Sequence, residues 1–449
     1  MNGFNNMAEL ALGSSGTASV GDVASPAALD IDAATEARLI AGARCAQPVR
    51  GLTHGFYKYP ARFSPAFARA AIEAFTQTGD WVLDNHVGGG TTLVEALALG
   101  RNGVGVDIST LAEFITTTKT TVLDDAELEL LGDWASRLAK TLNIRAASNH
   151  FTDFAELGYY RYLDDASRWR LRKAIELGIG AAVSLGSQRL EAFGRCAVLR
   201  TAQWALDGRK ELPTFAQFRA TLCALIREMI AGARELQSAA KASGVACSTH
   251  VLNRSGAGLE NDARIVALPR PRLILTSPPY PGVHVLYHRW QVDGRKEAPL
   301  PFMIANKLDG AGSSYYTMGD RRYPELKTYF DNIRASMGSA ASVANGETIV
   351  VQMVAFSDPS WQLEKYLKTM NEAGLTEVLL PSLHGQADGR LWRAVPSRRW
   401  YADQRGAISA SNEVVLFHRT SAVTRPPQLH RTSSLLSPRL PPAHQSTAR

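Results

Sequence analysis

Residues 81–100 have the sequence WVLDNHVGGGTTLVEALALG, which places three glycines between an apolar run and a helix-like segment. Its first four residues form a short apolar run ending in Asp84, which is typical of a buried strand. Three glycines follow, and TTLVEALALG then has the composition of a helix that ends at Gly100. A second apolar run, NGVGVDI at 102–108, completes a strand–helix–strand unit. The stretch therefore predicts an α/β protein built on a parallel sheet.

The glycines between the strand and the helix predict a ligand site. Glycine lets the backbone turn sharply and approach a ligand, and the first N–H groups of the helix can donate to it, although such turns also occur without a ligand. Asp107 follows Gly88 by 107 − 88 = 19 residues, a separation at which an acid commonly binds ribose hydroxyls. No lysine follows the glycines, which excludes a Walker loop, and Leu93 stands where a dinucleotide fingerprint has its third glycine. An S-adenosyl or similar nucleoside site remains.

The rest of the chain divides into blocks of different character. Helical periodicity runs through most of residues 123–249, whereas strand-like and helix-like segments alternate in 34–122 and again in 250–419. Residues 1–33 and the basic stretch 420–449 are predicted to be disordered tails. We therefore expect a Rossmann-like doubly wound sheet in two halves, 34–122 and 250–419, interrupted by a mostly helical insertion.

Composition narrows the class of protein. The 449 residues are 45% hydrophobic, but the longest apolar runs are far shorter than a membrane span, and the N-terminus lacks the pattern of a secretory signal. We expect a cytoplasmic protein that does not enter a membrane. The four cysteines form no CxxC pair, so neither a disulfide framework nor a metal site is expected. The net charge of +7 favours a polyanionic partner.

A second motif, RLILTSPPY at 272–280, ends a buried strand on two prolines. Proline removes N–H donors, so the chain must leave the sheet there, at the carboxyl end where open parallel sheets bind ligands. Thr276 and Ser277 contribute hydroxyl oxygens, Pro278 a carbonyl and Tyr280 a flat ring. Acceptors beside an aromatic ring suit a planar base that carries an amino group.

The two motifs together resemble those of the exocyclic-amino (N4-cytosine/N6-adenine) DNA methyltransferases. TSPPY at 276–280 looks like their catalytic motif, in which Ser, Asp or Asn precedes Pro-Pro and an aromatic residue. VLDNHVGGGTT at 82–92 resembles their S-adenosylmethionine motif, and residues 59–75 are similar to the segment that often precedes it. Residues 397–419 look like the closing hairpin of the same fold. The motif order resembles that of the subgroup with a target-recognition region between the two halves.

This resemblance implies roles for particular residues. The implied catalytic residues are Ser277, Pro278, Pro279 and Tyr280. The implied cofactor-binding residues are Tyr59, Pro60, Arg62, Phe63, Asp84, His86, Gly88, Gly90, Thr91, Thr92 and Asp107. The cofactor would be S-adenosylmethionine, and the Ser form of the motif with a preceding Thr favours cytosine N4 over adenine N6.

Three features depart from the family pattern. Asn85 and His86 replace the usual Pro and Phe, and Gly89 replaces a common Ser. Arg254 stands where the family usually has an acid, for which Asp262 is the candidate substitute.

Double-stranded DNA is the expected partner, and a restriction endonuclease or a defence-system protein is a candidate second one. The candidate nucleic-acid contacts are Arg168, Arg172, Arg209, Arg289, Arg295, Lys296, Tyr315 and Arg321, although a solvated basic face or buried aromatic packing explains such residues about as well. Sequence recognition is assigned to the helical insertion by analogy and position.

Alternative activities differ in the residues they need. A C5-cytosine enzyme needs a Pro-Cys pair, which this chain lacks, and enzymes that methylate a protein glutamine usually have Asn at the position of Ser277. Adenine N6 methylation, RNA methylation and a catalytically inactive DNA-binding relative stay open, the last because of Asn85, His86 and Arg254.

Overall fold

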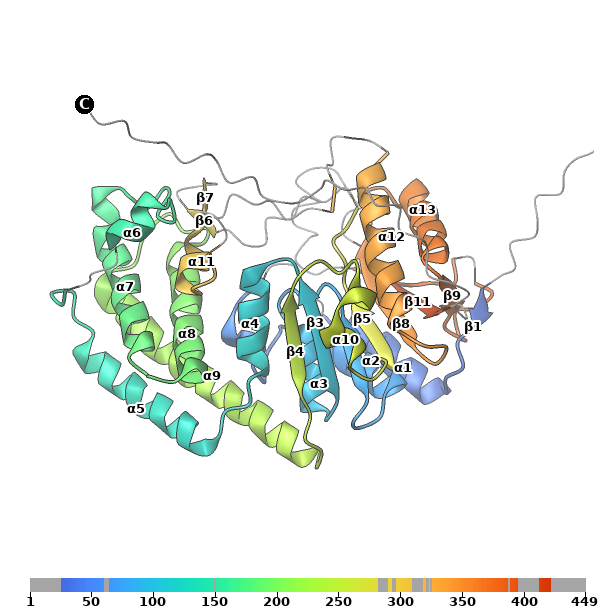
Figure 1. Cartoon of the computed structure of the whole chain (residues 1–449), viewed down its shortest axis with the longest axis horizontal. Coiled ribbons are helices and arrows are strands. Elements are labelled where there is room, and N and C mark those ends of the chain that lie inside the picture. Colours follow the sequence, from blue (N-terminus) through green and yellow to red (C-terminus); the bar gives the residue numbers. More distant parts are fainter. Residues whose placement is uncertain are drawn as a thin grey trace, which may run out of the picture.

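The structure, a computed structural model, describes residues 26–59, 64–147, 151–281, 290–292, 296–308, 318–319, 323, 325–386, 388–394 and 412–420. In these residues a nine-stranded mixed sheet lies beside a helical unit (Figure 1). The strand order is β1-β9-β11-β8-β5-β2-β3-β4, and β10 pairs with β11. The strands are β1 (Ala27–Ala28), β2 (Trp81–Asp84), β3 (Asn102–Asp107), β4 (Thr249–Asn253), β5 (Leu273–Thr276), β8 (Ile349–Ala355), β9 (Leu375–Leu379), β10 (Leu391–Ala394) and β11 (Asn412–Thr420).

After the edge strand β1, the chain passes to β2 near the middle of the sheet and winds from there in both directions. From β2 it proceeds through β3 to β4 on one side, and it then returns to β5 and β8 on the other. These pairings are parallel, whereas β11 is antiparallel to β8, β9 and β10. The strand order thus reverses between β2 and β5, which creates a crevice outside their adjacent carboxyl ends. The predicted doubly wound α/β class is confirmed.

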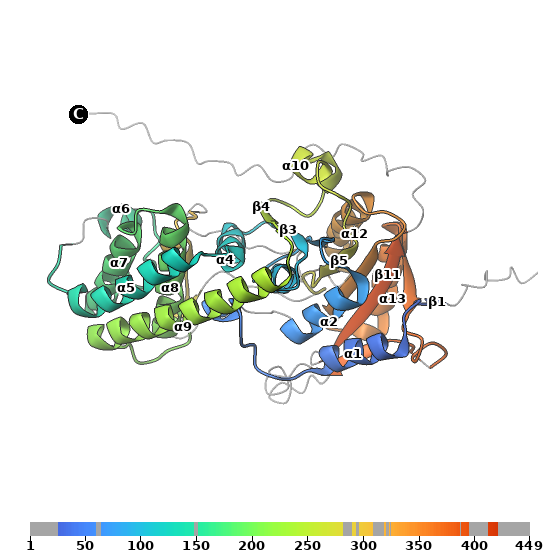
Figure 2. The same cartoon turned by 90° about the horizontal axis from the view of Figure 1, so that it is seen from below.

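Helices cover both faces of the sheet because its central strands are apolar on both sides. Val82 and Leu273 pack toward α1 and α2, whereas Leu83 and Ile274 pack toward α12 and α10. Figure 2 shows these two helix layers on opposite sides of the strands. The helices around the sheet are α1 (Ala33–Arg44), α2 (Pro65–Phe75), α3 (Thr91–Ala98), α4 (Thr110–Thr120), α10 (Ala263–Val266), α12 (Lys327–Ser342) and α13 (Pro359–Glu372), with short 3-10 turns η1 (His54–Phe56) and η3 (Leu259–Asn261).

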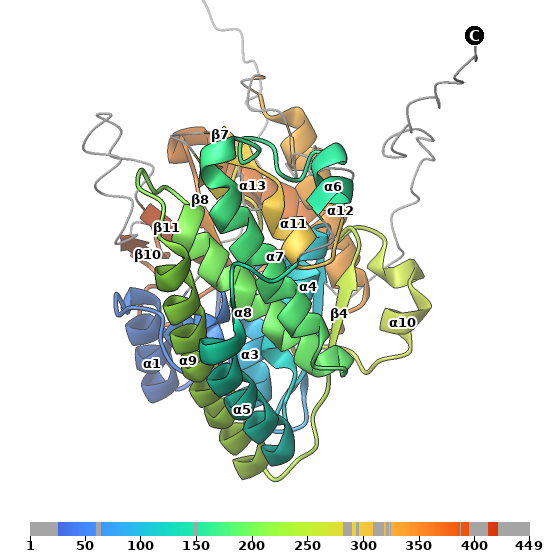
Figure 3. The ribbon, with the colours of Figure 1, turned by 90° about the vertical axis from the view of Figure 1, so that its left-hand side faces the viewer.

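The helical unit lies between α4 and β4 in the sequence and to one side of the sheet in space (Figure 3). It contains α5 (Asp125–Thr141), α6 (Phe151–Glu156), η2 (Ala166–Arg168), α7 (Trp169–Val183), α8 (Gln188–Leu206) and α9 (Phe215–Ala242). The long α9 leaves this unit and reaches the sheet, where Leu236 packs against Leu97 and Ala98 of α3. This contact attaches the helical unit to the helix that follows the glycine turn.

Part of the second half of the chain also belongs to the helical unit. The hairpin β6 (Trp290–Val292) and β7 (Lys296–Ala298), with α11 (Leu300–Ile304), shares the apolar core of α5 to α9. Trp290 is buried, and its indole Nε1 donates to the hydroxyl of Tyr57 at 2.9 Å. Residues 290–292 and 296–304 therefore pack with the helical unit, although the sequence analysis assigns them to the second half of the sheet domain.

The two ends of the described chain differ from the sequence prediction. Residues 26–33, predicted as tail, are ordered: β1 pairs with β9, and Asp32 caps α1 by accepting from the N–H groups of Ala34 and Thr35. A two-residue strand is too short to produce a recognisable pattern. Of residues 397–419, which resemble a closing hairpin, the structure describes 412–419, and these lie in β11. The antiparallel partner of β11 on this side is β10, which ends before residue 397.

Candidate active site

The two sequence motifs meet at the crevice between β2 and β5. Asp84 ends β2 and Thr276 ends β5, and the Thr276 hydroxyl donates to Asp84 Oδ1 at 2.8 Å. The hydroxyl of Thr92, in the first turn of α3, donates to Asp84 Oδ2 at 2.7 Å, and the backbone N–H of His86 donates to Oδ1 at 3.1 Å. Both oxygens of this buried carboxylate are therefore occupied by the protein. Asp84 joins the motifs.

Burial has opposite effects on the titration of the acids and the imidazole here. It raises the pKa of Asp84 to about 6, against the lowering effect of the hydrogen bonds from Thr92, Thr276 and His86. It also lowers the pKa of His86 to about 3. His86 is therefore neutral at pH 7.

The glycine turn has the conformation that its residues allow. Gly88 and Gly90 have φ values of +47° and +78°, a region that other residues rarely adopt. A Cβ at position 89 would lie 2.8 Å from Cβ of Tyr59, which packs over the turn. This contact explains why Gly89 replaces the serine common in the family pattern.

Helix α4 holds the turn from the other side. The Thr116 hydroxyl donates to the carbonyl of Gly88 at 3.1 Å, and Lys119 Nζ donates to the carbonyl of Gly89 at 2.8 Å. Lys119 is buried, so its charge is directed at this turn. Because these carbonyls are bound to α4, the backbone orientation of the turn is fixed. The sequence analysis missed Lys119, since nothing in the local sequence links residue 119 to residue 89.

Asp107 faces the turn from the end of β3. Its Oδ2 accepts from the N–H of Gly88 at 3.0 Å and its Oδ1 from the N–H of Ser109 at 2.9 Å. Burial raises its pKa to about 6. The carboxylate and the glycine turn therefore bound the same part of the crevice.

The catalytic motif is fixed by β8, α12 and the closing hairpin. The Ser277 hydroxyl donates to the carbonyl of Met353 at 3.1 Å and lies 3.4 Å from the Tyr280 hydroxyl. Tyr280 is buried and donates its own proton to Glu413 Oε1 at 2.7 Å. The carbonyl of Pro279 accepts from Tyr329 of α12 at 2.9 Å. The Ser277 proton thus goes to Met353 and the Tyr280 proton to Glu413, so the lone pairs of the Ser277 hydroxyl can accept.

Glu413 is a site residue that sequence reasoning missed. Its second carboxylate oxygen pairs with Arg393 at 2.9 Å, and both side chains are buried. The two residues are partners in the β10–β11 register. An acid directly before the apolar run VVLF was the available signal, since charges in buried strands are usually paired.

The region of Arg254 is occupied by an ion pair. Arg254 Nη1 lies 2.7 Å from Asp262 Oδ2, and the rest of its guanidinium donates to the carbonyls of Ser255 and Ala257. Asp262 also pairs with Arg264, and the hydrogen bonds from Arg264 and Arg254 hold the pKa of Asp262 well below its usual range. Asp262 is thus committed to two arginines and does not present a free carboxylate to the crevice.

The candidate nucleic-acid residues have different environments. Arg168 donates to the carbonyl of Tyr162 at 2.7 Å, and the Arg209 guanidinium lies 4.4 Å from the ring centre of Trp204. Arg172 is buried and donates to the carbonyls of Leu163 and Asp165, so here it closes a loop rather than facing solvent. Lys296 belongs to β7. Arg289, Arg295, Tyr315 and Arg321 lie outside the described residues, as do the cofactor candidates Pro60, Arg62 and Phe63.

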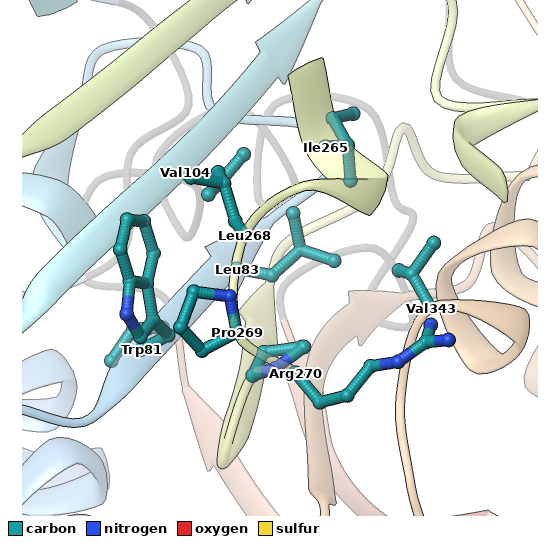
Figure 4. A pocket seen from close by; sticks show the side chains of 10 residues that line it. Trp81, Leu83, Val104, Ile265, Leu268, Pro269, Arg270 and Val343 are labelled. Carbon is teal, nitrogen blue, oxygen red and sulfur yellow. The ribbon is translucent and has the colours of Figure 1, made fainter. Parts of the chain in front are cut away.

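A small cavity lies near the N-terminal ends of β2 and β5, whereas the crevice lies at their C-terminal ends. It is lined by Trp81, Leu83, Val104, Ile265 and neighbouring residues at the start of β2 and before β5 (Figure 4). Its volume of about 20 Å³ is room for one water molecule. This cavity cannot hold a nucleoside.

Two features are absent from the described residues, a membrane-spanning helix and a cluster of metal-binding side chains. No helix among them is long and apolar enough to cross a membrane. No group of three or more His, Cys, Asp and Glu side chains that could hold a metal ion occurs in that part of the chain.

Comparison with known proteins identifies relatives of the first half of the sheet. A family described as DNA methylase, of the N6/N4 type, matches residues 43–117. Type II methyltransferase M.MjaII from Methanocaldococcus jannaschii is 32% identical over 76 residues, which are 17% of this chain and 14% of that protein. Type II methyltransferase M.MvaI from Kocuria varians is 36% identical over 80 residues, 17% of this chain and 18% of that protein. The matches thus span under a fifth of either relative.

Solved structures give a weaker likeness. Two structures of the rRNA methyltransferase aviRa from Streptomyces viridochromogenes each have a TM-score of 0.31. They are 10% and 12% identical and cover 84% and 87% of this chain and 92% and 94% of theirs.

Proposed function

We propose that this chain, whose residues 43–117 match the N6/N4 DNA methylase family, transfers a methyl group from S-adenosylmethionine to an exocyclic amino group of a DNA base. The observation that carries the proposal is the meeting of the glycine turn and the Ser277 motif at adjacent strand ends, joined through Asp84. A donor site and an acceptor site side by side are what a group transfer requires.

The residues of the crevice fit the cofactor chemically. The N–H groups at the start of α3 and the two glycines with positive φ provide donors and close backbone approach for its carboxylate or ribose. Asp107, once ionised, accepts from ribose hydroxyls. Tyr59 and His86 border the same turn. When bound, the cofactor supplies a methyl group on a positively charged sulfur.

Ser277 and Pro278 prepare the amino group for the transfer. An exocyclic amine is a poor nucleophile because its lone pair is delocalised into the ring. The Ser277 hydroxyl accepts one amine hydrogen, since its own proton is directed to Met353, and the Pro278 carbonyl accepts the other. The nitrogen then approaches tetrahedral geometry, and its lone pair is directed at the methyl group. The nitrogen–methyl bond would form as the sulfur–methyl bond breaks, the cofactor would leave as a neutral thioether, and the extra proton on the nitrogen would pass to water.

Tyr280 serves as the aromatic surface for a base flipped out of the duplex. The bond from its hydroxyl to Glu413 anchors one end of the ring, which limits how far the ring can turn. The target favoured by the Thr-Ser form of the motif is cytosine N4, and adenine N6 is the second candidate. Double-stranded DNA is the proposed substrate, and a restriction endonuclease is the proposed functional partner.

The test is nucleoside mass spectrometry of DNA from methylation-free cells that express the protein. We expect N4-methylcytosine, with N6-methyladenine as the alternative product, and its loss in a Ser277→Ala variant that still binds S-adenosylmethionine. Ser360→Ala, a change of the same type at the exposed start of α13, is the matched control. DNA without either product, together with methylated nucleosides in RNA, would reassign the substrate. No product together with no cofactor binding would indicate an inactive relative.

A further inference from the structure

A chain of hydrogen bonds ties the turn after β2 to α12 through His86. The Asn85 amide Nδ2 donates to Ser336 Oγ at 3.0 Å, and this oxygen lies 3.1 Å from His86 Nε2. His86 Nδ1 lies 3.3 Å from Thr276 Oγ1, which in turn donates to Asp84 Oδ1 at 2.8 Å. Asn85 and His86, which replace the usual Pro and Phe of the family pattern, are thus members of one network.

Asp84 and Asn85, at the two ends of this hydrogen-bond chain, determine which atoms carry the protons between them. The Thr276 proton goes to the Asp84 carboxylate, so Thr276 Oγ1 can only accept from His86 Nδ1. The Asn85 amide group also faces the Ser336 carbonyl at 3.4 Å and Met337 Sδ at 3.5 Å, which are acceptors. The NH₂ group of Asn85 therefore points toward these acceptors and donates to Ser336 Oγ. The Ser336 hydroxyl then donates its own proton to His86 Nε2. This network assigns His86 as neutral with its proton on Nδ1.

This tautomer lets His86 donate a hydrogen bond to Thr276, the residue next to Ser277. Thr276 is fully buried and immediately precedes Ser277. Its hydroxyl is held from two sides, by Asp84 of the cofactor motif and by His86, which is itself held by α12. A phenylalanine, the usual residue of the family pattern, could fill the same space but could not donate to Thr276.

We propose that His86 is a positioning residue that fixes the end of β5, and therefore Ser277, relative to the glycine turn and α12. This inference rests on the proposed function, because it concerns the alignment of the methyl donor with the accepting amine. Misplacement of reacting groups by about 1 Å can cost roughly 100-fold in rate. His86 acts on the rate through Thr276 and Ser277.

The tautomer is tested without measuring activity. Nitrogen-15 NMR of the full chain labelled at histidine separates Nδ1–H from Nε2–H imidazoles, and the His86 signal is the one lost in His86→Phe. We expect Nδ1 protonated and Nε2 bare at pH 7. An Nε2–H tautomer or an imidazolium would overturn the directed chain.

The positioning role is tested by two variants that separate the aromatic ring of the imidazole from its hydrogen-bond donor. His86→Phe keeps an aromatic ring, and His86→Asn keeps a donor near the position of Nδ1. We expect His86→Phe to lower kcat roughly 10- to 100-fold, with little change in the dissociation constant for S-adenosylmethionine, and His86→Asn to recover most of the loss. Ser336→Ala, which removes the anchor on α12, should lower kcat in the same direction, and its combination with His86→Phe should be no worse than His86→Phe alone.

The outcomes separate this proposal from the proposed function. Wild-type protein that methylates no base contradicts the proposed function. Active wild-type protein with an equally active His86→Phe variant contradicts the positioning role alone. A His86→Phe variant that loses cofactor binding instead of kcat would make His86 part of the cofactor wall and also overturn positioning.

Discussion

Asp84 and Asp107 are two buried carboxylates with raised pKa values and different neighbours. Asp84 accepts from side chains and backbone of the two motifs on both oxygens, whereas Asp107 accepts from the backbone N–H groups of Gly88 and Ser109. Burial raises the pKa of each to about 6 from about 3.8. Their contribution to folding stability is therefore fully present below about pH 4 and is lost as pH rises through about 6.

Cofactor binding should have the opposite pH dependence. If ionised Asp107 accepts from ribose hydroxyls, affinity for S-adenosylmethionine rises as pH increases through about 6 and is about tenfold weaker at pH 5 than at pH 7. Isothermal titration calorimetry across this range measures it. Asp107→Asn should bind weakly at every pH, and a wild-type affinity that does not change between pH 5 and 7 would contradict the role of Asp107.

The Arg393–Glu413 pair predicts a measurable asymmetry between single and double variants. Glu413→Gln leaves a buried guanidinium without its charged partner, and we expect a loss of about 3–5 kcal/mol in the free energy of unfolding. The double variant Arg393→Met/Glu413→Gln removes both charges and should recover part of that loss. Urea denaturation measures both. Equal stability of Glu413→Gln and the wild type would mean that the pair contributes nothing.

Helix α4 fixes the glycine turn through hydrogen bonds from Thr116 and Lys119. Lys119→Met keeps most of the side-chain length but leaves the Gly89 carbonyl without its donor. An unsatisfied buried group costs about 1–3 kcal/mol, and we expect a looser turn and an S-adenosylmethionine dissociation constant raised roughly 10-fold. Fluorescence titration with the cofactor measures it. Lys140→Met, at an exposed position of α5, is the matched control and should bind like the wild type.

An element can be predicted from sequence when the residues that determine it are neighbours in the chain. The runs WVLD and RLILT became β2 and β5 because a strand buried on both faces must be apolar throughout. Helix α12 was not recognised, since KTYFDNIRASMGSAAS contains small polar residues in place of a clear apolar stripe. The meeting of Asp84 with Thr276 followed from strand ends sharing one edge, but Lys119 could not be found from sequence because its partner lies 30 residues away.

At the scale of the whole molecule, the helical unit and the catalytic motif are physically connected. The chain runs from Tyr280 to Trp290, whose side chain is buried in the helical unit against Tyr57. Asp207, which follows the C-terminal end of α8, accepts from the backbone N–H of Gln291 at 3.0 Å. Trp290 and Gln291, which follow Tyr280 in the chain, are therefore held by the helical unit, whereas Tyr280 itself is held by Glu413 of the sheet.

If the helical unit contacts DNA, its arginines should contribute to the salt dependence of binding. Each phosphate contact contributes about 0.9 to the slope of log K against log salt concentration. Arg168→Ala combined with Arg209→Ala should lower that slope by about 2 and weaken binding to all sequences similarly. Fluorescence anisotropy at several salt concentrations measures it.

Arg172→Ala provides the contrast within the same unit. Because this guanidinium is buried and bonded to the carbonyls of Leu163 and Asp165, its removal should lower the melting temperature and leave the salt slope unchanged. The reverse pattern, a changed slope for Arg172→Ala and none for the Arg168/Arg209 pair, would mean that the helical unit meets DNA only after rearranging. In that case the loop of residues 163–165, which Arg172 holds through its carbonyls, would be the element that opens when DNA binds.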